Sequence, residues 1–147
     1  MVKREMKPVI NPNSKKPWQF AIDFDNTLSL EEYPTVGDHV PGAIETVKEL
    51  EEKGYSVYLW TNRTGVALLR AIVWAKNQGL KLRGANFESD PNLVDFENIS
   101  PKMFADYYID DKNLGCPRKS FESKGKIYKI VDWERLREIL VAEGFLE

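Results

Sequence analysis

The sequence predicts an open α/β fold in which helices cover both faces of a parallel sheet. Segments rich in β-forming residues alternate along the chain with segments of helical periodicity, which is typical of parallel sheets. Polar or acidic residues directly follow three of the expected strands. Because ligands bind beyond the carboxyl ends of the strands in such sheets, these residues also predict where a functional site lies.

The chain has the size and composition of one globular domain. Its 147 residues suffice to bury roughly 68 to 70% of the unfolded surface without help from a disulfide or structural metal. Charged residues make up 30% and the net charge is -2, which gives no sign of disorder or of a nucleic-acid-binding arm. Residues 1–17 are basic, contain three prolines and lack periodicity. We therefore expect a flexible or loosely docked tail, followed by a single domain at residues 18–147.

Cysteine content and hydropathy predict a cytoplasmic protein. Cys116 is the only cysteine, which excludes a disulfide scaffold or a cysteine-rich zinc site and suits a reducing compartment. The N-terminal residues lack the apolar run of about 7 to 15 residues that marks a secretory signal. No apolar run approaches the roughly 20 residues of a membrane span, so we expect no membrane partner.

The first half of the domain contains two expected strand and helix pairs. A buried strand covers residues 20–25, and a helix opens at Pro41, with apolar residues at positions 44, 47 and 50 before Gly54. Residues 55–60, YSVYLW, are β-formers that precede the polar TNRTG. A second helix is expected from about Thr64 to Gly79. Its predicted inner face consists of Leu68, Leu69, Ile72, Val73 and Ala75.

The second half contains weaker signals. Residues 80–87 predict a weak strand and turn, and the acidic and polar stretch 88–100 predicts no regular element. Residues 105–111, ADYYIDD, predict a strand that ends in a carboxylate pair. Residues 126–131, KIYKIV, predict a fourth or fifth strand, and an amphipathic segment after Asp132 predicts the last helix.

Four carboxylates are expected to meet at one edge of the sheet. Asp23 and Asp25 end the first strand, Asp110 and Asp111 end a later one, and Thr61 ends the strand between them. Ionised carboxylates repel one another unless a cation offsets their charge. Oxygen ligands without His or Cys select a hard ion such as Mg²⁺, since the single histidine, His39, is expected in a surface loop. Aspartate, Mg²⁺, a hydroxyl and a lysine together suit phosphoryl transfer, in which an aspartate can attack phosphorus.

These stretches resemble the motifs of the haloacid dehalogenase-like superfamily of phosphohydrolases. AIDFDNTLS at residues 21–29 is similar to its first motif, DxDx(T/V), and LWTN and YYIDDKN are similar to its second and fourth motifs. The segments PGAIETVKELEEKGYSVYLWTNRTG and ADYYIDDKNLG resemble its small, capless members. The resemblance covers about residues 18–114 and implies a three-layer, Rossmann-like fold without a large cap.

The resemblance also implies a role for each motif residue. Asp23 would be the nucleophile, Asp25 the general acid and base, and Thr61 a hydrogen-bond partner of a phosphoryl oxygen. The side chain of Asp23, the backbone carbonyl of Asp25 and a carboxylate of the Asp110–Asp111 pair would hold Mg²⁺. We prefer Asp111 as the direct ligand, with Asp110 behind it. Thr27 would hold the turn beside Asp25.

The lysine of the third motif is assigned to Lys102, which stands eight residues before Asp110. Its ammonium group would steady the phosphoryl group and the nucleophile. Arg63, Lys112 and Arg118 are alternatives for the same role.

Specificity is expected to come from loops at the edge of the sheet. Residues 28–40 are too few for a helical cap, and residues 80–101 allow at most a small loop or hairpin. Tyr33, Phe87 and Phe96 in the candidate loops 29–38 and 85–100 could stack on a base or sugar. Acidic residues in these loops argue against nucleic acid as the substrate, so a small phosphorylated molecule is favoured; they include Glu31, Glu32, Glu88, Asp90 and Asp95. An open site also leaves room for a homo-oligomer in which a neighbouring subunit covers it.

Three alternatives compete with hydrolysis of a small phosphomonoester. A phosphatase acting on a phosphoprotein or a nucleic-acid end would share the mechanism. A receiver domain of two-component signalling uses similar residues, but its acidic pair precedes the phosphoacceptor aspartate, whereas here the DxDxT motif comes first. A non-catalytic binding module on the same fold is the third alternative, and the intact motifs disfavour it.

Overall fold

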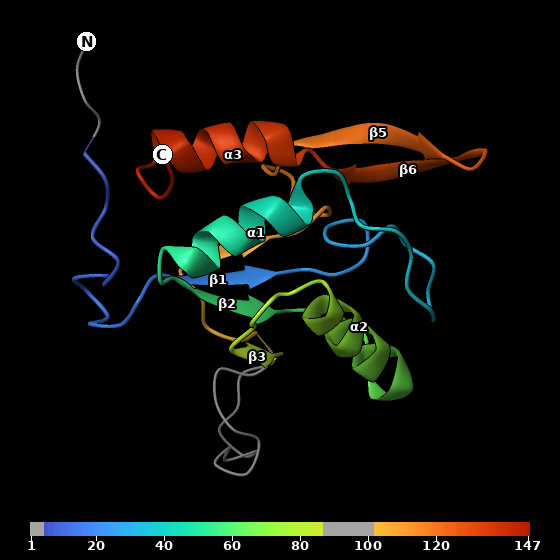
Figure 1. The fold of residues 1–147 in the computed structure, drawn as a ribbon, viewed down its shortest axis with the longest axis horizontal. Helices are drawn as coiled ribbons and strands as arrows, with labels where there is room; N and C mark the ends of the chain where they lie inside the picture. Colours follow the sequence, from blue (N-terminus) through green and yellow to red (C-terminus); the bar gives the residue numbers. More distant parts are fainter. Residues whose placement is uncertain (1–4, 87–101) are drawn as a thin grey trace.

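A computed structural model describes residues 5–86 and 102–147. Within these ranges the centre of the protein is a parallel sheet with strand order β3-β2-β1-β4 (Figure 1). The strands are β1 (Gln19–Ile22), β2 (Ser56–Leu59), β3 (Gly84–Ala85) and β4 (Tyr107–Ile109). Because β1 pairs with both β2 and β4, its carboxyl end lies between theirs. The predicted α/β class with a parallel sheet is confirmed.

The three helices of the described ranges cover one face of this sheet. They are α1 (Ala43–Glu52), α2 (Gly65–Asn77) and α3 (Trp133–Ala142). The main core cluster joins Phe20, Ile22, Val57 and Leu59 of the sheet to buried residues of all three helices. The opposite face carries a small cluster of Ala21, Tyr58, Met103 and Ala105. A helical layer on that second face therefore stays a prediction.

The buried face of α2 matches the predicted one only in part, since Ala75 is buried and Leu68 and Ile72 pack against the core. Ala67, Ala71 and Ala75 are buried, whereas Leu69 and Val73 are 59% and 48% exposed. Small side chains let the helix lie close to the sheet, and the helix is apolar at most positions on all sides. Hydrophobic periodicity therefore could not select the correct face. The predicted end of this helix is confirmed, since Gly79 has a φ of 91°.

Residues 126–131 form a strand outside the parallel sheet, which corrects the predicted arrangement. This strand, β6 (Lys126–Val131), pairs antiparallel with β5 (Arg118–Ser123), which was not predicted. Lys124 and Gly125 at the turn have positive φ values of 51° and 78°, as a tight two-residue hairpin requires. Tyr128 and Ile130 fasten the hairpin to the core.

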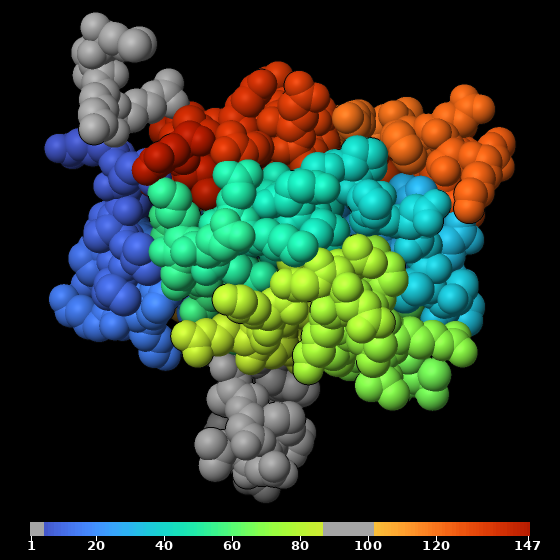
Figure 2. All heavy atoms as spheres, in the orientation of Figure 1, coloured from blue at the N-terminus to red at the C-terminus, as the bar shows by residue number. Residues whose placement is uncertain are grey.

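The hairpin and the loop of residues 28–40 lie together at one end of the molecule (Figure 2). The Tyr128 hydroxyl donates a hydrogen bond to Glu32, and Lys124 lies 3.7 Å from Asp38. At the opposite end, the N-terminal segment contacts the domain. The Lys7 amide donates to the Gly144 carbonyl at 2.9 Å, and the Asn11 amide group donates to Asp106 at 3.0 Å. The mobility of this segment stays a prediction.

Two further predictions concern the candidate loop at residues 85–100 and membrane-spanning helices. Of the candidate loop at residues 85–100, residues 87–100 lie outside the described ranges, and Phe87 and Phe96 with them. In the part of the chain that the structure describes, no helix has the length and apolarity needed to cross a membrane.

Candidate functional site

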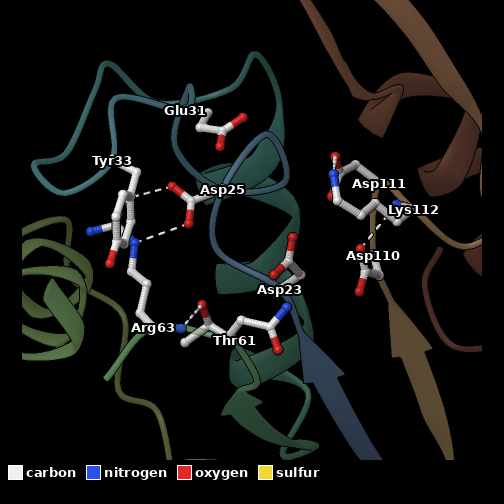
Figure 3. A pocket seen from close by; sticks show the side chains of 10 residues that line it. Asp23, Asp25, Glu31, Tyr33, Thr61, Arg63, Asp110, Asp111 and Lys112 are labelled. Atoms are coloured by element: carbon white, nitrogen blue, oxygen red, sulfur yellow. Dashed lines mark hydrogen bonds and ion pairs between the residues drawn. The ribbon is translucent and has the colours of Figure 1, made fainter. Parts of the chain in front are cut away.

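The predicted site residues come together in one pocket. Asp23, Asp25, Thr61, Asp110 and Asp111 line a hollow of about 300 Å³ beyond the carboxyl ends of β1, β2 and β4 (Figure 3). The same pocket is also lined by Glu31, Tyr33, Asn62, Arg63 and Lys112. The prediction that three separate polar groups share one edge of the sheet is confirmed.

The parallel ladder explains why the two acidic motifs meet. Asp23 follows β1 directly, and its amide donates to the Ile109 carbonyl at the end of β4 at 2.9 Å. After the buried Phe24 the chain turns away from the sheet, and Asn26 in this turn adopts a left-handed conformation with a φ of 58°. Asn26 is the turn former that its type suggests.

Asp23, Asp110 and Asp111 form a cluster of like charges. One carboxylate oxygen of each lies within 4.8 Å of the others. Burial raises the pKa of Asp23 from 3.8 to about 8, and the charge of Asp110 and the hydrogen bond and charge of Asp111 add to the rise. The pKa of Asp111 is also raised, with burial as the largest cause. The chain itself thus leaves the charge of this cluster poorly compensated.

Thr27 joins the two motifs that supply this cluster. Its Oγ1 donates to Oδ2 of Asp23 at 3.1 Å and accepts from the Asp111 amide at 3.3 Å. The Trp133 indole at the start of α3 donates to the Thr27 carbonyl at 2.7 Å. Thr27 was expected to hold the turn beside Asp25, and its amide donates within that turn to the Phe24 carbonyl at 3.3 Å. Its side chain bonds to Asp23 and Asp111 rather than to Asp25. It fixes the spacing of the carboxylates in the cluster.

Asp25 lies in a different electrostatic setting. Its Oδ1 accepts from Nη2 of Arg63 at 2.7 Å, and its Oδ2 accepts from Nε of Arg63 at 2.9 Å. Arg63 is only 2% exposed. Such a bidentate pair fixes the orientation of the carboxylate as well as balancing its charge. Sequence reasoning named Arg63 only as an alternative to Lys102, and its spacing from Asp25 gave no signal for this pairing.

Thr61 lies at the pocket but does not cap α2. Its amide donates to Oδ1 of Asn86 at 2.8 Å, and its Oγ1 accepts from the Arg63 amide at 3.1 Å. The residue at the N-cap position of α2 is Thr64, whose side chain makes no capping hydrogen bond. The hydroxyl of Thr61 is therefore placed for contact with a ligand in the pocket.

The basic residues considered for the third motif differ in position. Lys102 is exposed, and its Nζ lies 4.5 Å from the centre of the Tyr108 ring. Lys102 is not among the residues that line the described pocket, whereas Lys112 is. The Nζ of Lys112 lies 3.9 Å from Oδ2 of Asp111, and Arg118 donates to the Asp111 carbonyl at 3.4 Å. His39 is exposed in its loop, as predicted.

The acidic cluster has the composition of a site for a hard divalent cation. Its donors are carboxylate oxygens from two segments that the fold brings together, and Thr27 holds them at a defined spacing. Their raised pKa values have the physical causes that a bound cation would offset, namely burial and mutual repulsion. The residues present therefore fit Mg²⁺.

Comparison with known proteins identifies a relative. No protein-family model and no curated protein matches the sequence. A solved structure, that of a conserved protein coded by a locus from Bacteroides thetaiotaomicron, is 31% identical in sequence, with a TM-score of 0.68. The match covers 85% of this chain and 90% of that one. The chain belongs to the same family as the Bacteroides protein. This relationship supports the mixed α/β architecture over most of the chain.

Proposed function

We propose that the protein is a cytoplasmic, Mg²⁺-dependent phosphohydrolase that hydrolyses a small phosphomonoester through an aspartyl-phosphate on Asp23. The observation that carries the proposal is the grouping of Asp23 with Asp110 and Asp111 in one pocket, with Asp25 and Thr61 beside them. These residues match, in order, motifs of the haloacid dehalogenase-like superfamily.

The proposed superfamily fold is the small, capless type. The described structure supports the part of this proposal that concerns the first motif. Between β1 and α1, residues 23–42 contain no helix, which supports the proposal that no helical cap follows the first motif. The second place where such enzymes carry a cap falls partly on residues outside the described ranges. The pocket is therefore proposed to be open toward its substrate.

The proposed reaction has two steps. In the first, a carboxylate oxygen of Asp23 bonds to phosphorus as the bond from phosphorus to the leaving oxygen breaks, and Asp25 gives that oxygen a proton. In the second, water attacks the phosphorus of the aspartyl-phosphate, Asp25 takes a proton from the water, and the carboxylate of Asp23 is released with inorganic phosphate. Each carboxylate oxygen has two lone-pair sites, so the Arg63 pair leaves Asp25 sites for proton exchange.

The remaining residues bind and orient the substrate. The hydroxyl of Thr61 is proposed to donate to a phosphoryl oxygen. Mg²⁺ held by Asp23, the carbonyl of Asp25 and Asp111 would supply positive charge that offsets the charge on the phosphoryl oxygens. The cationic partner from the third motif remains Lys102 by resemblance, and Lys112 by its position in the pocket.

A phosphatase assay tests the proposed function. An aryl phosphate and a panel of phosphorylated metabolites would be offered with Mg²⁺ and with a chelator, to wild type, to Asp23→Asn and to Leu69→Ala as a surface control. We expect turnover that needs Mg²⁺, falls by at least about a thousandfold in Asp23→Asn and is unchanged in Leu69→Ala. Inactivity of wild type on every substrate, or full activity of Asp23→Asn, contradicts the proposal.

The two lysine candidates can be separated in the same assay. Lys102→Met and Lys112→Met remove one ammonium each without changing the carboxylates. The variant that loses turnover by about a hundredfold or more identifies the lysine that steadies the phosphoryl group. If neither variant loses turnover, neither Lys102 nor Lys112 serves this role.

A further inference from the structure

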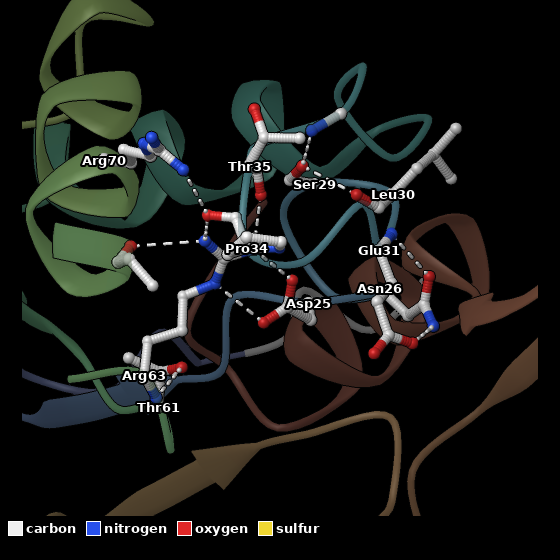
Figure 4. Close-up of polar contacts among 12 residues, drawn as sticks. Asp25, Asn26, Ser29, Leu30, Glu31, Pro34, Thr35, Thr61, Arg63 and Arg70 are labelled. Atoms are coloured by element: carbon white, nitrogen blue, oxygen red, sulfur yellow. Dashed lines mark hydrogen bonds and ion pairs between the residues drawn. The ribbon is translucent and has the colours of Figure 1, made fainter.

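Every hydrogen-bond donor of the Arg63 side chain is already in use. Its Nε and Nη2 bind Asp25, and Nη2 also donates to the Thr35 carbonyl at 2.7 Å (Figure 4). Its Nη1 donates at 3.2 Å to the carbonyls of both Pro34 and Ala67. A guanidinium has five N–H groups, and these five bonds account for all of them. Arg63 therefore has no N–H left for a phosphoryl oxygen, and its role is to hold the surrounding segments in place.

The loop beside the pocket is one of the segments that Arg63 holds. Two of its carbonyls, those of Pro34 and Thr35, accept from the guanidinium, and Arg70 also donates to Pro34 at 3.3 Å. Tyr33 precedes them, and the centre of its ring lies 5.3 Å from the guanidinium carbon of Arg63. The Tyr33 ring thus packs against a buried guanidinium whose own position is set by its hydrogen bonds.

Tyr33 nevertheless remains open to the pocket. It is 62% exposed, although it lines the pocket and one part of its ring rests on Arg63. Figure 3 shows Tyr33 and Arg63 on the side of Asp25, with Asp110, Asp111 and Lys112 on the other side of Asp23. In the proposed mechanism Asp25 exchanges its proton with the leaving oxygen. The Tyr33 ring therefore lies on the side that the leaving group would occupy.

We propose that Tyr33 is a stacking surface for the leaving group, and that the substrate is a phosphomonoester whose leaving group is a planar ring without further negative charge. This inference rests on the proposed function, since the roles of Asp23 and Asp25 define the leaving-group side. An aromatic ring that packs on one cation and is otherwise open can stack on planar groups. Glu31 lines the same side of the pocket, and its charge repels leaving groups that carry additional anionic groups.

A binding comparison tests the stacking surface apart from turnover. Dissociation constants of phenyl phosphate and glycerol 2-phosphate would be measured by calorimetry with Mg²⁺, in an Asp23→Asn background that slows hydrolysis. The two ligands share the phosphoryl group and differ in the planarity of the rest. Tyr33→Leu removes the ring, Tyr33→Phe keeps it, and Leu69→Ala is an exposed control away from the pocket.

We expect phenyl phosphate to bind about tenfold more tightly than glycerol 2-phosphate. Tyr33→Leu should abolish that preference and leave the glycerol 2-phosphate affinity unchanged, whereas Tyr33→Phe and Leu69→Ala should keep it. Equal affinities, a preference that survives Tyr33→Leu, or no binding of either ligand overturns the inference. If phenyl phosphate binds more tightly but turnover does not depend on Asp23, the proposed mechanism is wrong and the stacking surface stands. If turnover depends on Asp23 but the two ligands bind equally, the stacking surface is wrong and the mechanism stands.

Discussion

The two aspartates of the stretch AIDFDNT are two residues apart in the chain and lie in opposite electrostatic environments. Asp23 lies with Asp110 and Asp111, and burial and these like charges raise its pKa to about 8. Asp25 accepts two hydrogen bonds from a buried arginine that balances its charge. The negative charge of Asp25 is thus balanced by a residue of the chain, whereas the negative charge of the cluster around Asp23 needs a cation from solution.

We therefore expect the Asp25–Arg63 side of the pocket to stabilise the fold, and the side with Asp23, Asp110 and Asp111 to bind a ligand. A buried ion pair with all donors satisfied holds its neighbours together, but either partner alone is costly. A cluster of carboxylates destabilises the folded chain until protons or a cation offset the repulsion. Removing the charge of Arg63 and removing a charge from the carboxylate cluster should therefore have opposite effects on the free energy of unfolding.

The largest effect is expected for Arg63→Leu. This change leaves Asp25 without its partner and frees the carbonyls of Pro34, Thr35 and Ala67, so unfolding should become easier by about 3 to 5 kcal/mol. Arg137→Leu is the matched control, since Arg137 binds Glu49 through the same two donor positions on the surface. Its cost should stay below about 1 kcal/mol. Equal costs in urea unfolding would show that Asp25 is not held as described.

The second prediction concerns Mg²⁺ on the other side of the pocket. At a concentration a hundred times its dissociation constant, Mg²⁺ should raise the free energy of unfolding by about 2.7 kcal/mol and the melting temperature by roughly 5 °C or more. Asp111→Asn should remove this response, while Arg137→Leu should retain it. A melting temperature that ignores Mg²⁺ in wild type, or an undiminished response in Asp111→Asn, would count against a cation site.

The third prediction is a dependence of stability on pH in the absence of divalent cations. The pKa of Asp23 is raised from 3.8 to about 8 on folding, so the folded chain holds a proton that the unfolded chain releases. The associated stability is fully present below about pH 4 and is lost as the pH rises through 8, on the order of 2 kcal/mol after allowance for screening. Asp23→Asn should flatten this part of the profile in chemical unfolding. An identical slope in both proteins would mean that another group titrates.

The smallest effect is expected for Thr27→Val. The hydroxyl of Thr27 bridges Asp23 and the Asp111 amide. Its loss should lower the free energy of unfolding by about 1 kcal/mol and weaken Mg²⁺ binding several-fold. Thr27→Ser keeps the hydroxyl and should keep most of the affinity in calorimetric titration. If both variants bind Mg²⁺ as wild type does, the bridge does not set the spacing of the cluster.

The sequence predicted where the site lies, but it did not predict which residues pair with one another inside the pocket. The strands β1, β2 and β4 and the polar residues that follow them were predicted from local signals, namely β-forming runs that end in Asp23, Thr61 and the Asp110–Asp111 pair. The pairing of Asp25 with Arg63 depends on a distance between segments 38 residues apart, which no periodicity encodes. Mutual positions of loops are set by tertiary contacts, and a single sequence does not reveal them.

Two errors in the fold also arise because tertiary contacts override local sequence signals. The buried face of α2 was misassigned at Leu69 and Val73 because apolar residues surround the helix, and packing against the sheet selects the alanines. β5 was missed because RKSFES at residues 118–123 contains a single large apolar residue, Phe121. Its partner β6 and the turn at Lys124–Gly125 hold that segment in a strand, so the pairing overrides its weak propensity.

The central claim is that Asp23 forms a covalent bond to phosphorus. The most direct measurement is mass spectrometry of the acid-quenched enzyme after brief reaction with phenyl phosphate and Mg²⁺, followed by borohydride reduction to mark acyl phosphates. We predict that the peptide containing Asp23 gains one phosphoryl group, that the chelator prevents this gain, and that borohydride converts Asp23 alone. Turnover without any phosphorylated aspartate, or a label on an aspartate other than Asp23, would contradict the account.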